Sequence, residues 1–496
     1  MKKSLKLLVA NRGEIALRVL RTCREMGIPT VAVYTDVDEL ALHVSYADEA
    51  VALGERNGYL DIDKLLQAAR QSSATAIHPG YGFLAENADF AQAVEEAGLT
   101  FIGPRSETIA LLGDKLASRQ VASECGLPVL PGSNSPLPPE LPLEMARQVR
   151  YPVLVKAAAG GGGRGIRLAT CAEELPEVIA AARQEALAAF GDDKVFLESM
   201  VQQARHIEVQ ILGDGRGNVL CLGERECSIQ RRLQKLIEEA PAAGLPESIR
   251  AQLYDAAFRL GHQLNYRGLG TVEFLLDAQN EFHFIEVNPR IQVEHPVTEM
   301  VTGMDLVKEQ LLVALGEPLR MLQDQVELRG AAIEARVLAE DPAQYFLTST
   351  GKISFLKEAG GPGIRIDSAI YQGLQVSADY DSLLAKIIAW GENRPAAIRR
   401  MRRALDEFQI GGLATDLEFL KQIINSPRFR AGNITTTYLE EFSPQKAQPE
   451  SELERAVALA AALYVNEQHA RKPAPEPSHL DLWQRTAWQE QMKAKY

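Results

Sequence analysis

The sequence predicts a mixed α/β and α+β fold, with an open α/β domain at the N-terminus and strand-rich regions after it. Three observations predict this class. Strands and helices alternate over the first hundred residues, a segment dense in Pro, Gly and Ser follows at 126–143, and strand and hairpin patterns dominate from Tyr151 onward. The length of 496 residues suggests about three domains at roughly 150 residues each.

The first elements form a strand–helix–strand unit. Leu5–Ala10 is a short apolar strand, and Ile15–Met26 has the apolar spacing of a helix that ends at Gly27. Thr30–Tyr34 is a second strand, so a parallel sheet is expected. The pattern recurs as a strand at 76–77, a helix near 86–97 and a strand at 99–102, which ends the open α/β domain near Pro104.

The later elements are more varied. A helix is expected over Ser106–Cys125. The alternation of polar and apolar residues over His206–Ile211 predicts a half-buried strand, with its turn at 213–218. A third region begins near Arg329, and a linker at 443–452 precedes a helix over 453–471.

Composition excludes several classes of protein. Asp and Glu total 66 against 53 Lys and Arg, a net charge of −13, so a basic nucleic-acid-binding surface is not supported. The five cysteines are scattered without a CxxC pair, which argues against a disulfide framework or a zinc ribbon and indicates a reducing compartment. No apolar run is long enough to span a membrane, so we expect a cytoplasmic protein without a membrane anchor.

A glycine-rich segment is the most distinctive local pattern. Lys156 ends an expected strand, and a strand-like stretch resumes at Ile166, where a dinucleotide-binding fold would begin a helix. No Walker or protein-kinase motif is present. The pattern predicts a hairpin flap whose bare amides bind phosphates, with Lys156 as charge partner; a mobile linker is the alternative. The loop glycines are Gly160, Gly161, Gly162, Gly163 and Gly165.

Two carboxylates are predicted to face each other in a later hairpin. If the chain turns at Gln279–Asn280, Glu273 lies opposite Glu286, and Asn288 falls on the same face. Opposed carboxylates repel unless a cation lies between them, and these oxygen donors suit Mg²⁺ or Mn²⁺ shared with substrate phosphates. A solvated strand face is the alternative.

A row of polar residues continues from this hairpin. Every second residue is polar, and an extended chain would point all of them to one side. The order places metal ligands first, then an arginine for an anion, an amide to orient it and a carboxylate able to take a proton. An ordinary surface strand explains the alternation but not this order. The row is Glu286, Asn288, Arg290, Gln292 and Glu294.

A local basic cluster and a lone arginine complete the candidate residues. Residues 224–235 contain three arginines and Lys235, with Glu238 and Glu239 after them, which suits a small anion or a phosphate chain. A charged surface is the commoner explanation of such a cluster. Arg336 stands alone on an expected strand over Ile333–Leu338.

Together these stretches resemble the biotin carboxylase family. The long motif over 290–299 is highly specific, and the likeness covers residues 3–445 in the right order. The other matching segments are 9–16, 76–84, 160–165, Arg336 with 339–342, and 380–383.

The resemblance implies an ATP-grasp ligase of three domains. ATP and bicarbonate would form carboxyphosphate, whose carboxyl group passes to the ureido nitrogen of protein-bound biotin. The implied divisions are an N-terminal α/β domain over 1–115, an ATP-grasp domain over 116–330 with a lid at about 131–203, a strand-rich C-terminal domain over 331–445, and a linker and helical tail over 446–496.

The resemblance also implies roles by position. The ATP contacts would be Lys115, Lys156, Gly160, Gly161, Gly162, Gly163, Glu198, His206 and Gln230. Two divalent cations, Mg²⁺ or Mn²⁺, would be held by Glu273, Glu286 and Asn288. Bicarbonate would be bound by Lys235, Arg290, Gln292 and Val293, with Glu294 as the base that deprotonates it. Arg336 would stabilise the biotin enolate.

The chain departs from the family pattern at a few positions. Leu233 stands where the family usually has His near the nucleotide, which affects the expected ribose contacts. Residues 347–350 read Leu-Thr-Ser-Thr where Leu-Pro-Ser-Pro is usual, and Gly268-Leu269 replaces the common Asn-Ala. No expected catalytic position is lost.

Biotin is not expected on this chain. Biotin carriers place their lysine in Met-Lys-Met within a hairpin, and the nearest approach is Met492-Lys493-Ala494. The resemblance therefore implies a separate biotin carboxyl carrier protein, a carboxyltransferase subunit and a homodimer. The final acceptor stays open among acetyl-CoA (in fatty acid biosynthesis), another acyl-CoA and pyruvate. The tail with Trp483 and Trp488 is either a helix packed on its own body or a docking segment for partners.

Two other functions compete with this hypothesis. An ATP-grasp ligase for an amine or amino acid would leave the bicarbonate row unexplained. A nucleotide-sensing scaffold without catalysis would not need Lys235, Arg290, Glu294 and Arg336.

Overall fold

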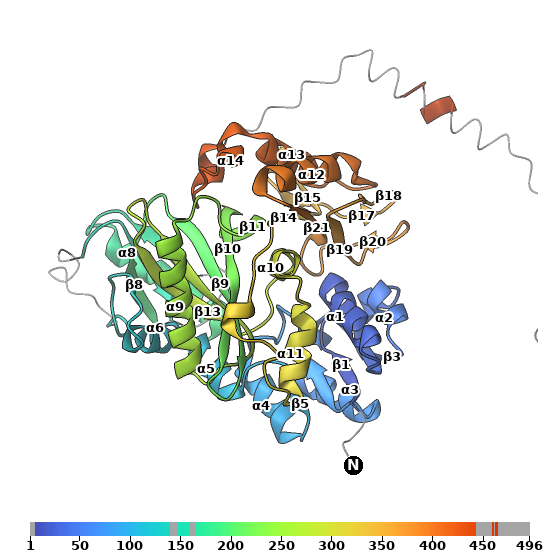
Figure 1. The fold of residues 1–496 in the computed structure, drawn as a ribbon, viewed down its shortest axis with the longest axis horizontal. Helices are drawn as coiled ribbons and strands as arrows, with labels where there is room; N and C mark the ends of the chain where they lie inside the picture. The colour runs from blue at the N-terminus through green and yellow to red at the C-terminus, as the bar shows by residue number, and fades with distance from the viewer. Residues whose placement is uncertain are drawn as a thin grey trace, which may run out of the picture. The chain divides into compact units, whose positions relative to one another are not determined.

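The computed structural model describes residues 5–138, 147, 149–158, 165–442, 459–460 and 462–464. Contacts divide the chain into a unit over Met1–Ser443 and a unit over Pro444–Tyr496. Figure 1 shows the first unit with its helices and strands labelled. In the second unit, 459–460 and 462–464 are helical, within the helix predicted over 453–471. The predicted linker and both tail tryptophans lie outside the described residues.

The N-terminal region is an open α/β layer, as predicted. Five parallel strands pair in the order β3-β2-β1-β4-β5. Apolar strands alternate with amphipathic helices, so each helix buries one face on the sheet. The strands are β1 (Leu7–Val9), β2 (Thr30–Thr35), β3 (Glu49–Gly54), β4 (Ala76–His78) and β5 (Thr100–Phe101), and the helices are α1 (Gly13–Glu25), α2 (Leu42–Tyr46), α3 (Ile62–Gln71) and α4 (Ala88–Glu96).

The single helix predicted over Ser106–Cys125 is two helices. Helix α5 (Ser106–Gly113) ends before Asp114, and α6 (Lys115–Glu124) begins after it. The Asp114 carboxylate accepts hydrogen bonds from the backbone N–H groups at 116 (2.9 Å) and 117 (3.0 Å). An aspartate that caps the second helix in this way interrupts the first. The break places Lys115 at the first turn of α6.

A small sheet with its own core follows. Strands β6 (Val153–Ala157), β7 (Ile166–Ala169) and β8 (Val195–Ser199) pair in the order β7-β6-β8, and α8 (Leu175–Phe190), which the sequence reading missed, packs on them. The strands on either side of the glycine run pair antiparallel, as the predicted flap requires. Gly160, Gly161, Gly162 and Gly163 lie outside the described residues.

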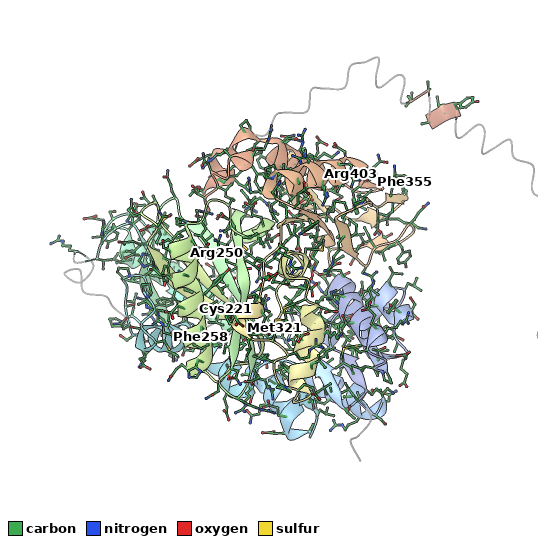
Figure 2. The ribbon with its side chains drawn as sticks, in the orientation of Figure 1. Cys221, Arg250, Phe258, Met321, Phe355 and Arg403 are labelled. Carbon is green, nitrogen blue, oxygen red and sulfur yellow. The ribbon has the colours of Figure 1, made fainter. Side chains whose placement is uncertain are left out.

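An eight-stranded sheet carries the polar residues singled out in the sequence. Its order is β13-β12-β9-β10-β11-β14-β21-β19. Beside it lie α9 (Glu247–Gln263), α10 (His295–Thr302) and α11 (Leu306–Ala314); Figure 2 labels Arg250 and Phe258 on α9. The strands are β9 (Arg205–Asp214), β10 (Val219–Arg231), β11 (Gln234–Ala240), β12 (Arg267–Leu276), β13 (Phe282–Asn288), β14 (Ala331–Leu338), β19 (Ile364–Ser368) and β21 (Leu383–Gly391).

Strand β9 is buried on both faces, so the prediction of a half-buried strand is wrong. Ile207 and Val209 pack in the core that α9 completes. His206, Glu208 and Gln210 alternate with them and are also buried, on the opposite face. The alternating polarity of β9 therefore reflects an apolar core on one face and a buried ionic cluster on the other face, which is not exposed to solvent.

The large sheet runs through the predicted domain boundary at 330. Strand β11 pairs antiparallel with β14, with Glu238 opposite Glu334, and so joins strands on either side of that boundary. Helices α12 (Arg394–Glu407) and α13 (Leu417–Asn425) cover one face of the part of the sheet that contains β14 and β21, and α10 packs on the other face. The remaining elements are β15 (Glu340–Asp341), β16 (Leu347–Thr348), β17 (Gly351–Lys352), β18 (Phe355–Lys357), β20 (Gln375–Val376), β22 (Gln409–Gly411), α14 (Pro427–Arg430) and α15 (Tyr438–Glu441).

The cysteines and the apolar helices bear on two predictions from composition. All five cysteines are free thiols, in agreement with the predicted lack of a disulfide framework. Among the residues that the structure describes, none of the helices is both long and apolar enough to cross a membrane.

Candidate active site

A buried ammonium group lies at the centre of the ionic cluster. Lys235, near the start of β11, donates hydrogen bonds to Glu208 (2.6 Å), Glu273 (2.8 Å) and Glu294 (2.6 Å). Burial alone would lower the pKa of Lys235, but the three carboxylates raise it well above its usual value. Lys235 is therefore a fixed positive charge that joins β9, β12 and the start of α10.

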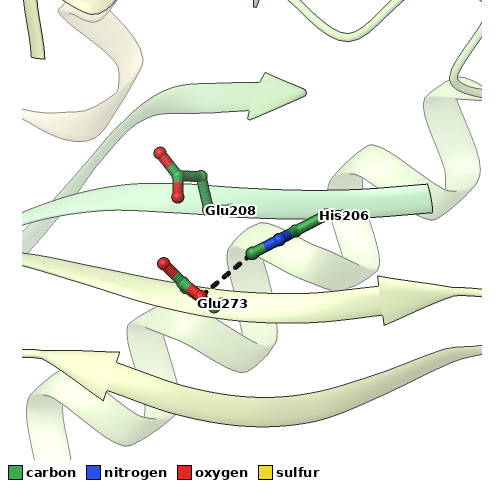
Figure 3. A group of neighbouring side chains, drawn as sticks. All are labelled: His206, Glu208 and Glu273. Atoms are coloured by element: carbon green, nitrogen blue, oxygen red, sulfur yellow. Dashed lines mark hydrogen bonds and ion pairs between the residues drawn. The ribbon is translucent and has the colours of Figure 1, made fainter. Parts of the chain in front are cut away.

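Glu273 and Glu286 face each other across the β12–β13 hairpin, as predicted. A bulge after Glu273 shifts the pairs nearer the turn by one residue but leaves this pair in place. The Asn288 amide donates to Glu273 Oε1 over 2.9 Å. On the other side of Glu273, His206 Nε2 lies 2.9 Å from Oε2 (Figure 3). The predicted face of two carboxylates and one amide is thus assembled.

The two hairpin carboxylates have different electrostatic surroundings. Burial would raise the pKa of Glu273, but Lys235 and His206 lower it below its usual value. For Glu286, burial and the neighbouring Glu273 raise the pKa, although Lys115 Nζ lies 3.8 Å from Oε2. Glu286 therefore offers oxygen atoms whose negative charge is only partly balanced, a donor set that fits a hard divalent cation.

The polar row does not continue as a strand. Strand β13 ends at Asn288, because Pro289 has no N–H group to extend the ladder. The backbone then turns, and Glu294 becomes the residue that precedes α10. The expectation that an extended chain aligns all five side chains is therefore wrong. Glu294 reaches the cluster through the start of a helix instead.

Glu294 is a fully buried carboxylate between two cations. Lys235 donates to Oε1, and Arg336 on β14 donates to Oε2 over 2.9 Å. Burial would raise the pKa of Glu294, but Lys235, Arg336 and Arg225 lower it well below its usual value. Glu294 is therefore ionised at neutral pH and has the charge state of a proton acceptor.

Several buried N–H groups near Glu294 lack a protein acceptor. Among the described residues, Gln292 Nε2 and Arg336 Nε have no hydrogen-bond partner. Arg290 also has its Nε without a hydrogen bond, although it lies 3.1 Å from Glu86 in an ion pair. A buried donor without an acceptor costs about 1–3 kcal/mol. Such donors on neighbouring residues are the features expected of a small-anion site.

The ATP-side candidates lie on the smaller sheet and on α6. Lys156 of β6 donates a hydrogen bond to Glu198 of β8, and Arg119 lies 3.3 Å from the same carboxylate. All three side chains are buried. Lys115 approaches Glu286 from α6. Lysines from two elements therefore border the hairpin carboxylates and the region of the glycine run.

The arginines of the basic cluster over 224–235 have different surroundings, and Arg232 alone among them is exposed. Arg225 is fully buried, donates to Glu208 and holds Gln210 and Thr298 at 2.7 and 2.9 Å. Arg231 pairs with Glu340. Glu208, which binds both Lys235 and Arg225, was missed as a site residue, although its alternation with His206 placed the two on one face.

The remaining predicted positions lie nearby. Gln230 is buried beside Lys235 across the β10–β11 pair. The Val293 carbonyl accepts a hydrogen bond from Lys386 Nζ (2.9 Å). Leu233 is 53% exposed in the β10–β11 turn, where Arg232 and Leu233 have φ of 50° and 65°.

Three family models match the chain in order along the sequence. They are the biotin carboxylase N-terminal domain at residues 3–109, the carbamoyl-phosphate synthase L chain ATP-binding domain at 114–322, and the biotin carboxylase C-terminal domain at 334–441.

Curated and solved relatives agree with these matches. The biotin carboxylase of a Nostoc species is 51% identical over 442 residues, which is 88% of this chain and 99% of the relative. The propionyl-CoA carboxylase alpha chain of Ruegeria pomeroyi is 44% identical over 92% of this chain and 72% of its own length. The biotin carboxylase domain dimer of Hydrogenobacter thermophilus 2-oxoglutarate carboxylase, solved with MgADP, ADP and bicarbonate, has a TM-score of 0.86 at 45% identity and covers 89% of this chain and 99% of that one.

Proposed function

This chain belongs to the biotin carboxylase family, and we propose that the cluster around Lys235, Glu294 and Arg336 is the centre at which it carboxylates biotin. The activity is that of an ATP-dependent ligase: bicarbonate supplies the carboxyl group, biotin accepts it, and ADP and phosphate are released. The relatives described above are all carboxylases, so they give no support to a ligase for an amine or amino acid.

One observation carries the assignment of the centre. An ionised buried carboxylate, Glu294, is bound by Arg336, and within the described part of the chain Arg336 Nε and Gln292 Nε2 are buried donors without an acceptor. Bicarbonate has oxygen acceptors for such donors and one proton to lose. We assign bicarbonate to this point, with Arg290, Val293 and Lys235 as its further neighbours.

Glu294 is the base in this proposal. In the protein alone, Lys235 and Arg336 hold its pKa low, which makes it a weak base. An anion placed among the same cations competes for their charge, so the pKa of Glu294 rises as bicarbonate binds. Glu294 then takes the bicarbonate proton, and the freed oxygen attacks the terminal phosphate of ATP to form carboxyphosphate.

The ATP site lies toward the smaller sheet. Lys115 and Lys156 supply positive charge for the phosphates, and Gln230, Glu198 and His206 border the nucleotide. Glu273, Glu286 and Asn288 would hold Mg²⁺ or Mn²⁺, which when bound neutralises phosphate charge. Gly160–Gly163, which the family resemblance assigns to the phosphates, lie outside the described residues.

Arg336 serves the second half of the reaction. Its guanidinium lies between two carboxylates at the edge of the bicarbonate region. Because its Nε has no hydrogen-bond partner among the described residues, Arg336 can also stabilise the negative charge that develops on biotin when the ureido proton of biotin leaves.

The proposal extends to assembly. We propose that the biotin acceptor is attached to a separate carrier protein, that a carboxyltransferase subunit completes the enzyme, and that the chain forms a homodimer in the cytoplasm. The dimeric state of the Hydrogenobacter relative supports the homodimer. We also propose domains over 1–115, 116–330 and 331–445 with a tail over 446–496, a division close to the family-model bounds.

A steady-state assay with free biotin tests the assigned centre. ADP release by the full chain, with ATP, Mg²⁺ and bicarbonate, should rise when biotin is added. Glu294→Gln should lower the bicarbonate-dependent rate about 10²- to 10⁴-fold, the usual contribution of a general base. Glu239→Gln is the matched control, because Glu239 is also a buried carboxylate but pairs with Arg394 (2.6 Å). Full activity in Glu294→Gln would refute the base assignment.

A further inference from the structure

Two buried carboxyl groups lie behind the proposed centre. Glu238 on β11 and Glu334 on β14 are directly opposite each other in the antiparallel register, and neither is exposed. Opposed side chains in such a pair have Cβ atoms about 4.5–5.5 Å apart. Glu238 Oε2 and both carboxyl oxygens of Glu334 are buried without a hydrogen-bond partner among the described residues, and Glu238 Oε1 has the ion pair with Arg336. None of the roles proposed above uses either residue.

Arg336 connects this pair to the base. Its Nη2 atom lies 2.5 Å from Glu238 Oε1 and 2.9 Å from Glu294 Oε2. Arg336 and Glu334 are two residues apart on β14, so they share the face that α10 covers. The guanidinium is therefore held from two sides, by Glu294 in front and by Glu238 behind.

The pair cannot be doubly ionised at low cost. Like charges directly opposite in a sheet are destabilising, and burial adds a desolvation cost to each. The groups that act on the pair are few: Arg336, Glu294 and Lys235 around Glu238, and Lys386, Arg336, Glu238 and Glu294 around Glu334. From α10, His295 is also buried, and Cys227 on β10 faces Glu238. Lys386 is already shared with Glu14 (3.0 Å) and Asp367 (3.8 Å), so cations are too few to balance both carboxylates.

The two positions in the pair are not equivalent. Glu238 has a direct ion pair with Arg336, whereas Glu334 forms no ion pair with any of the residues that the structure describes. Burial raises the pKa of Glu334 well above its usual value. Burial also raises the pKa of Glu238, to about 7, against the opposing effect of Arg336. A shared proton therefore belongs on Glu334.

We propose that Glu238 and Glu334 hold one proton between them, carried by Glu334, and that ionised Glu238 is the positioning residue that keeps Arg336 against Glu294. The inference rests on the proposed function, since Arg336 and Glu294 take their roles from it. When Glu238 also gains a proton, Arg336 loses its ion pair with Glu238. Glu294 is then the one carboxylate in the proposed pair of contacts that balances the positive charge of Arg336. Glu294 becomes a weaker base, and Arg336 is less fixed for biotin.

The test compares Glu238→Gln with Glu334→Gln in the full chain. Glu238→Gln reproduces the protonated form at every pH, so kcat for biotin-dependent ADP release should fall roughly 10- to 100-fold, as expected for a misplaced catalytic group. KM for ATP should not change, because the ATP contacts lie elsewhere. Glu334→Gln replaces a group that is already neutral, so its kcat should stay within about twofold of the wild-type value.

The pH profile separates positioning from a merely structural role. With the bicarbonate concentration held constant, wild-type kcat should rise as the pH passes through about 7, the pKa of Glu238. Glu334→Gln should keep this rise and Glu238→Gln should lose it. Glu238→Asp retains an ionisable group, so it should keep the rise of kcat with pH at a reduced kcat. If Glu238→Gln does not fold, the pH profile of Glu238→Asp tests the positioning role instead.

Each outcome has one meaning. A wild-type profile and rate in Glu238→Gln would overturn the inference while leaving the proposed function intact, and so would an equal loss of kcat in Glu334→Gln. A wild-type chain with no biotin-dependent ADP release would refute the proposed function itself.

Discussion

Replacing Lys235 with methionine removes the ammonium group that three buried carboxylates share. Methionine fills a similar volume without the charge, so the packing around β11 is largely kept. Each carboxylate then retains one other cationic or ring-nitrogen partner. These are Arg225 for Glu208, His206 for Glu273 and Arg336 for Glu294.

The expected loss of stability follows from the burial of these groups. Glu208 and Glu294 are fully buried, and Glu273 is 5% exposed, so water cannot replace the lost hydrogen bonds. Removing one partner from a buried ion pair typically costs about 3–5 kcal/mol. We expect Lys235→Met to lower the free energy of unfolding by that amount at pH 7. The loss is not expected to exceed this range, because each carboxylate keeps one partner.

The difference in the free energy of unfolding between Lys235→Met and the wild-type chain should depend on pH. The folded-state pKa values of Glu273 and Glu294 are lowered, so their stabilising effect is present above the ordinary value of 4.5 and is lost as the pH falls through the folded-state values. Lys235, with a raised pKa, contributes below its ordinary value of 10.5 and loses its effect only above that. The stability difference should therefore be largest near neutral pH and should narrow below 4.5.

Urea unfolding followed by far-ultraviolet circular dichroism measures this difference at pH 7 and at acid pH. Lys194→Met is the matched control, because Lys194 is exposed and its ion pair with Asp192 (3.2 Å) is of a kind worth about 0.2–1 kcal/mol. Equal unfolding of Lys235→Met and the wild-type chain at pH 7 would show that Lys235 does not balance the buried carboxylates. A difference that grows below pH 4.5 would contradict the electrostatic explanation.

Two further changes have defined outcomes. Leu233→Gly should raise the free energy of unfolding by about 1 kcal/mol in urea unfolding. Leu233 has a φ of 65° in the β10–β11 turn, and such a conformation costs a non-glycine residue about 1–2 kcal/mol. An unchanged or lower free energy of unfolding would contradict this explanation. Glu286→Gln should raise the Mg²⁺ concentration for half-maximal activity roughly tenfold or more. The exposed Glu281 of the same hairpin is the control, and Glu281→Gln should leave the Mg²⁺ titration unchanged.

The hairpin that presents Glu273 and Glu286 could be predicted from the sequence. The side-chain period of a strand is two, so once the turn is placed the opposed residues follow by arithmetic. The bulge after Glu273 was not foreseen, because nothing in the local sequence marks it. The pairs next to the turn are one residue out of the predicted register, and the bulge restores that register at Glu273, so Glu273 still faces Glu286.

The polar row after the hairpin shows where periodicity stops being informative. The alternation continues through 290–294, but the missing N–H of Pro289 ends the ladder, and Glu294 enters the cluster from the start of α10. The basic cluster over 224–235, which the sequence suited to a small anion or a phosphate chain, is divided by the fold. Arg225 is fully buried against Glu208, whereas Lys235 lies at the centre of the ionic cluster.

The sequence by itself determined the parallel N-terminal sheet, the opposed carboxylates of the β12–β13 hairpin and the likeness to a family, because these depend on local periodicity and on residue order. Only the tertiary structure decided which charges meet. Lys235 binds three carboxylates from β9, β12 and the start of α10, and Arg336 meets Glu238 through the pairing of β11 with β14. Contacts between distant strands follow from the order in which the sheet assembles, and each buried charge then takes the partners that this order places within its reach.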